Sequence, residues 1–92
     1  MKEHHLMVLD ALSSCTSPGG EMCRPFKAIH NEMGCLGYPD MPIPQIRRIV
    51  RHFARKGWAE FHFPLWTEEG EPAGAGYCIS KAGLAALDEV TA

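Results

Sequence analysis

The feature that most constrains this fold is a change of hydrophobic period at Gly57. Before this glycine, apolar residues recur every three or four positions, as along one face of an α-helix. They are Ile46, Ile49, Val50 and Phe53. After the glycine they alternate, as along a β-strand, in the order Phe61, Phe63 and Leu65. Gly57 itself is typical of the left-handed residue that ends a helix. The sequence therefore predicts a helix beginning at Pro44, after an extended Ile43, and then a strand across 58–66.

Two more helices are expected before this pair of elements. Leucines three residues apart predict a helix over 4–14, and the run 17–20, Ser-Pro-Gly-Gly, ends it. A second helix is expected to begin at residues 24–26, with Pro25 in its first turn, and to end at Gly34 and Gly37. Its inward face would carry Phe26, Ile29, His30 and Met33. Residues 38–42 then form a connector.

After the strand, an acidic turn is expected over 67–74 and a return strand over 75–79. Ser80 is a candidate N-cap for a last helix, whose apolar stripe would be Leu84, Leu87 and Val90. The order is helix, helix, helix, hairpin, helix. We therefore expect an α+β fold: a three-helix bundle, a two-stranded hairpin and a C-terminal helix. Because the chain has 92 residues and no linker-like stretch, residues 1–92 are expected to form a single domain.

The sequence resembles the winged helix-turn-helix DNA-binding superfamily. The segment IPQIRRIVRHFARKGWAEF is similar to a recognition helix with its glycine stop and first wing strand. The segment YCISKAGLAAL is similar to the strand-to-helix exit of small MarR-like and PadR-like regulators. Two features depart from that pattern: the connector between residues 34 and 44 is longer than the usual turn, and the expected wing tip is acidic.

The charge pattern agrees with a local nucleic-acid surface. The formal net charge is −2, yet residues 41–59 carry five of the nine Lys and Arg and no Asp or Glu. On a helical wheel the four arginines among them lie opposite the apolar face, where neighbouring like charges repel each other slightly. The resemblance implies that this face enters the major groove of double-stranded DNA. The implied DNA-binding residues are Gln45, Arg47, Arg48, Arg51, His52, Arg55 and Lys56.

These observations favour a transcription regulator of bacterial or phage type, acting as a homodimer through its terminal helices. The alternative is a winged-helix module that binds an acidic protein surface and no DNA. Glu68, Glu69 and Glu71 at the expected wing tip would repel phosphate, so that tip is also a candidate contact for a protein partner. Trp66 beside it would either cover the core or stack on a partner.

Neither catalysis nor a cofactor is predicted. The sequence has no glycine-rich phosphate loop, no H-E-x-x-H and no G-x-S-x-G. Cys15, Cys23, Cys35 and Cys78 form no C-x₂-C pair, so we expect reduced and mostly buried thiols and no metal site. Disulfides, or a sensor site built from the first three cysteines and a histidine, stay open as alternatives.

The remaining expectations concern location and the other histidines. No run of about 18 apolar residues exists, so no membrane span is predicted and a cytoplasmic protein is expected. His4 and His5 are expected at a fraying terminus. His30 and His62 are expected to be partly buried polar residues, and His52 could add positive charge at mildly acidic pH.

Overall fold

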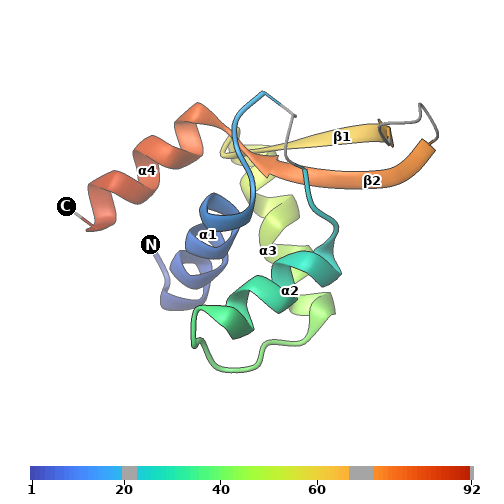
Figure 1. The fold of residues 1–92 in the computed structure, drawn as a ribbon. Helices are drawn as coiled ribbons and strands as arrows, with labels where there is room; N and C mark the ends of the chain where they lie inside the picture. The colour runs from blue at the N-terminus through green and yellow to red at the C-terminus, as the bar shows by residue number, and fades with distance from the viewer. Residues whose placement is uncertain (20–22, 67–71, 92) are drawn as a thin grey trace.

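Four helices and one antiparallel hairpin make up the described part of the protein, in the order that the sequence predicts. The computed structural model describes residues 1–19, 23–66 and 72–91. The elements are α1 (Glu3–Cys15), α2 (Phe26–Cys35), α3 (Ile43–Lys56), β1 (Ala59–Trp66), β2 (Pro72–Ile79) and α4 (Lys81–Thr91). The predicted α+β fold class is confirmed, with a winged-helix-like arrangement. The hairpin, or wing, and α4 lie on the same side of the bundle of α1, α2 and α3 and extend in opposite directions (Figure 1).

The core lies between α1, α2 and α3 and continues under the base of the wing. Its largest fully buried side chains come from α1, α2, α3 and β2. They are Phe53, Leu9, Leu12, Ile29, Met33, Ile46, Ile79, Val8, Val50 and Cys78. The inward face predicted for α3 is confirmed, since each of its four apolar residues is buried. Leu87 anchors α4 at 8% exposure, whereas Val90 at the end of the predicted stripe is 44% exposed.

The two ends of α3 fix its orientation. Gly57 has a φ of 84°, the left-handed conformation expected of it, and Trp58 N donates to Phe53 O at 2.9 Å. The start lies one residue earlier than predicted, because Pro42 is the N-cap and Ile43 is helical instead of extended. The backbone N–H groups of Gln45 and Ile46 both donate to Pro42 O. The bias against helix before Pro44 is a preference, and these two bonds outweigh it.

The connector between α2 and α3 is pinned along its length, although it is longer than a usual helix-turn-helix turn. The hydroxyl of Tyr38 donates to the carboxylate of Asp10 on α1. His30 Nε2 lies 3.0 Å from a carboxylate oxygen of Asp40. Met41 is buried at 5% exposure. These contacts hold the start of α3 against the other two helices.

The wing is a single antiparallel pair. Its register runs from Ala59 opposite Ile79 to Trp66 opposite Pro72, with irregularities at His62/Leu65 and Leu65/Trp66. β2 begins at Pro72, earlier than the predicted Ala75, so residues 72–74 are strand and not turn. The acidic residues of the expected wing tip lie outside the described residues, as does the side chain of Trp66.

A third segment joins the base of the wing, which the sequence did not indicate. Arg24 and Tyr77 form an isolated antiparallel bridge, in which each backbone N–H donates to the other residue's carbonyl at 2.9 Å. Gly76 permits this approach, because a Cβ there would lie 3.0 Å from the backbone carbon and oxygen of Arg24. The chain ahead of α2 is therefore attached to the outer edge of β2.

The start of α4 packs tightly against the end of α3. Ser80 Oγ accepts a hydrogen bond from Gly83 N at 3.1 Å, which confirms the predicted N-cap. The same hydroxyl donates to Gly57 O at 2.5 Å. Gly83 is buried, and a Cβ at this position would lie 2.3 Å from the carbonyl oxygen of Trp58. No larger residue fits here without moving backbone.

Gly83→Ala is therefore expected to lower the free energy of unfolding by about 2–3 kcal/mol, as overpacking does. Gly34→Ala is the matched control. Gly34 lies in α2 with nothing within 4 Å of the added Cβ, so this change should raise stability by roughly 0.5–1 kcal/mol. Urea denaturation followed by circular dichroism measures both. Equal effects of the two substitutions would contradict the tight packing of α4.

Candidate nucleic-acid interface

The outward face of α3 carries a dense set of positive charges. Burial of the apolar face leaves Arg47, Arg48, Arg51, Arg55 and Lys56 exposed. Among the residues that the structure describes, Arg48, Arg51 and Arg55 have no ion-pair partner. A surface helix usually mixes acidic and basic residues, and α3 has no acidic residue at all. Its free cations can therefore bind an anionic partner without first breaking an ion pair.

The cations at the sides of this face rest on aromatic rings. Arg47 Cζ lies 5.7 Å from the ring centroid of Phe26 on α2. Lys56 Nζ lies 4.3 Å from the ring centroid of Trp58. Both are cation–π contacts, which restrict a side chain while leaving its charge uncompensated. Arg47 and Lys56 are thus held at opposite ends of α3.

A groove of about 560 Å³ runs between α3 and the first turn of α1. Its lining is mostly cationic or titratable: Lys2, Glu3, His4, His5, Gln45, Arg48, Ile49, His52 and Arg55. The structure thus brings Gln45, Arg48, His52 and Arg55 of the predicted set together around the groove. Arg47, Arg51 and Lys56 lie outside its lining, on the rest of the exposed face.

The groove also includes residues for which the sequence predicted no such role. His4 and His5 were expected at a fraying terminus, but both lie in α1. The ring of His5 lies 5.2 Å from that of His52 and packs edge-on against Phe53. His4 Nδ1 is 3.4 Å from Gln45 Nε2. The helix predicted over 4–14 already included both histidines, but only the packing of α1 on α3 reveals the shared groove.

Burial and positive charge act together on one histidine of the groove. Burial lowers the pKa of His5 below its usual value, and the positive charge of His52 and of neighbouring lysines lowers it further. A histidine surrounded by positive charge releases its proton more readily. An incoming phosphate would reverse this effect.

A second group of titratable side chains lies at the base of the wing, away from this face. One ligand atom each from Cys23, His62 and Cys78 lies within 4.8 Å of the others. Burial raises the pKa of the Cys23 thiol to about 11, and the hydrogen bond with Cys78 and the charges of Cys78 and Glu60 contribute. All four cysteines are thiols, with Cys35 exposed and Cys15 half-buried. Of the three cysteines that might have formed a sensor site, only Cys23 belongs to this group.

Comparisons with known proteins identify the fold. The chain is similar to the crystal structure of a candidate DNA-binding protein from Ralstonia eutropha JMP134, with a TM-score of 0.68 and 13% sequence identity. The match covers 100% of this chain and 99% of that one. No protein-family model and no curated protein matches the sequence. Within the described part of the chain, no helix is long and apolar enough to cross a lipid bilayer.

Proposed function

We propose that this protein binds double-stranded DNA by placing the exposed face of α3 in the major groove. The observation that carries the proposal is the set of exposed arginines on α3, opposed by no acidic residue of that helix. On nucleic acid, such a face would contact the backbone phosphates. Neutralising a phosphate releases the cations condensed on the DNA, and this release favours binding. The fold that the chain shares with a candidate DNA-binding protein supports the same conclusion.

The docking follows from the position of each side chain on α3. In helix-turn-helix proteins the N-terminal part of the recognition helix contacts base edges. Gln45 and Arg48 occupy that part, and an arginine there can bond guanine O6 and N7. Arg55 and Lys56, in the last turn, would contact the phosphate backbone. Lys2, the N-cap of α1, would also contact phosphate, because it lines the same groove as Arg48.

The role that we infer is transcription regulation, as a homodimer that presents two copies of α3. Two recognition helices on one face of DNA must lie about 34 Å apart, one helical turn. The terminal helices are our candidate contact, because Met1 and Val90 are 49% and 44% exposed and line one groove with Ala86. The role that we infer is DNA binding without catalysis.

The salt dependence of DNA binding tests the main proposal. With three or four phosphate contacts in each subunit, a dimer should show a slope of log K against log salt of roughly −5 to −7, at about −0.9 for each phosphate. The measurement is fluorescence anisotropy on random duplex DNA across a salt series. A flat response would contradict the proposal. Binding to an acidic protein in place of DNA would favour the alternative, a winged-helix interaction module.

Charge reversal locates the interface. Arg51→Glu should weaken DNA binding at least about tenfold, because an arginine contact contributes about 1–3 kcal/mol. Lys81→Glu is the matched control, since it makes the same charge change at an exposed position on α4. Equal losses for the two variants in the anisotropy assay would show that only net charge matters and would refute the docking on α3.

The lowered pKa of His5 in the groove predicts proton uptake on binding. Since the pKa of His5 is lowered in the free protein, a bound phosphate should raise it. A higher pKa in the complex means that affinity rises as pH falls from about 7.5 to about 6. His5→Gln should flatten this dependence while leaving affinity at the higher pH unchanged. An increase in affinity with rising pH would contradict the proposed contact.

Self-association has its own test. Val90→Asp should shift the protein from dimer to monomer in sedimentation equilibrium, because a charge at a buried contact is costly to desolvate. Asp88 is also exposed on α4, and Asp88→Asn provides a control on the same helix. A wild-type chain that is monomeric throughout the range that supports DNA binding would overturn the dimer.

A further inference from the structure

The base of the wing brings potential metal ligands into one row across three chain segments. Glu60 on β1 lies directly opposite Cys78 on β2 in the strand register. On the other edge of β2, the antiparallel bridge between Arg24 and Tyr77 places Cys23 beside Cys78. In such a ladder the pair next to a hydrogen-bonded pair has its side chains closest together. His62, two residues after Glu60, lies on the same face of β1.

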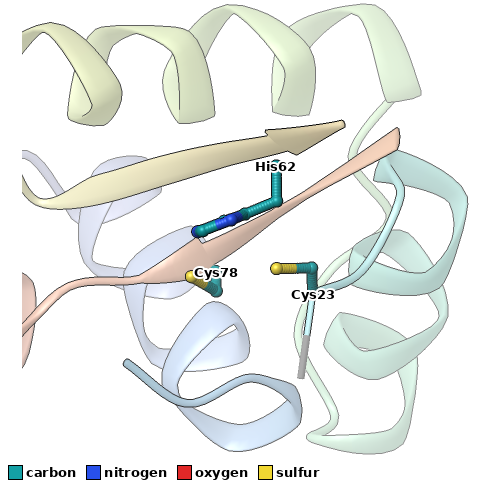
Figure 2. A group of neighbouring side chains, drawn as sticks. All are labelled: Cys23, His62 and Cys78. Atoms are coloured by element: carbon teal, nitrogen blue, oxygen red, sulfur yellow. The ribbon is translucent and has the colours of Figure 1, made fainter. Parts of the chain in front are cut away.

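The distances between these side chains are close to those of a metal site. Ligand atoms of Cys23, His62 and Cys78 all lie within 4.8 Å of one another (Figure 2). Glu60 Oε2 lies 3.4 Å from His62 Nε2 and 3.9 Å from Cys78 Sγ. In tetrahedral Zn²⁺ sites, bonds of about 2.0–2.3 Å place the ligand atoms roughly 3.3–3.8 Å apart. Only a small contraction of Cys23, His62 and Cys78 is therefore needed, and Glu60, which contacts two of them, lies next to this group.

The surroundings suit a closed site. Cys78 is fully buried and Cys23 is 9% exposed, while His62 and Glu60 flank them from the solvent side with side-chain exposures of 37% and 50%. The close approach of the chain at Gly76 holds the two cysteine-bearing segments together before any ion binds. Such a site differs from a surface cluster of carboxylates, because its thiols are buried and come from separate segments.

We propose that Cys23, His62 and Cys78, with Glu60 as the fourth ligand, bind one Zn²⁺ ion at the base of the wing. Two thiolates, an imidazole and a carboxylate form a set of borderline-soft ligands that suits Zn²⁺ and excludes Mg²⁺ and Ca²⁺. The ion links β1 and β2 to the chain just ahead of α2. It therefore fixes the direction in which the wing leaves the helical body, whether or not α3 binds DNA.

Cobalt substitution provides the test, on the full chain, reduced and stripped with a chelator. One Co²⁺ per chain should bind with the intense visible bands of tetrahedral coordination and with thiolate-to-metal charge transfer, and Zn²⁺ should displace it. Zn²⁺ should also raise the midpoint of thermal unfolding, because it binds only the folded state tightly. Absence of these bands, or octahedral spectra, would overturn the proposal.

The Zn²⁺ affinity of substituted variants shows which side chains are ligands. Cys78→Ser and His62→Gln should each weaken Zn²⁺ binding by more than about 100-fold, beyond what loss of an outer-sphere contact costs. Cys35→Ser is the control, since Cys35 is exposed and outside the group. If Cys78→Ser fails to fold, His62→Gln and Glu60→Gln decide the question, because both side chains are partly exposed. Unchanged affinity in these two variants would refute the site.

Cys23 and Cys78 could form a disulfide instead of binding zinc. Mass spectrometry of the intact protein distinguishes the disulfide from the zinc-bound form. Protein purified from a reducing compartment should carry both thiols and stoichiometric zinc. A Cys23–Cys78 bond formed quantitatively under those conditions, without zinc, would overturn the proposal. Zinc binding is measured without DNA, so its failure leaves the proposed DNA interface standing, and failure to bind DNA leaves the zinc site standing.

Discussion

Burial of one face of α3 is the constraint on which the rest of the structure depends. Phe53, Ile46 and Val50 are fully buried, so the helix cannot rotate without exposing them. Each such side chain contributes roughly 1.5–3 kcal/mol when it leaves water. That free energy also holds the arginines outward, where mutual repulsion costs only a few tenths of a kcal/mol for each pair. Hydrophobic packing thus maintains a charged surface that electrostatics alone would disperse.

The elements could be predicted from the sequence because their determinants are local. The stop at Gly57, the cap at Ser80 and the period of α3 each depend on neighbouring residues. The groove beside α3 and the group around Cys78 could not, because they depend on where α1 meets α3 and where residue 24 meets residue 77. The predicted DNA-binding residues fall into two sets for the same reason: one set lines the groove beside α1, and the other lies outside it. A helical wheel gives the exposed arc but not the neighbour on either side of it.

The two candidate sites are joined through a short section of backbone. Ser80 donates to the carbonyl of Gly57 through its hydroxyl and to that of Trp58 through its backbone N–H. The end of α3, the start of β1, the end of β2 and the start of α4 therefore meet at one point. Any change that reorients the wing base acts on this joint.

The bridge between Arg24 and Tyr77 has a consequence for the solubility of the hairpin. A strand with an open edge is a template for pairing with another molecule, and natural sheets cover or interrupt such edges. At Tyr77, β2 is hydrogen-bonded on both sides, to β1 and to the chain ahead of α2. At this position the outer edge of β2 is therefore not open to a strand from a second copy. The chain ahead of α2 thus covers the edge of β2 where the hairpin joins the helical body.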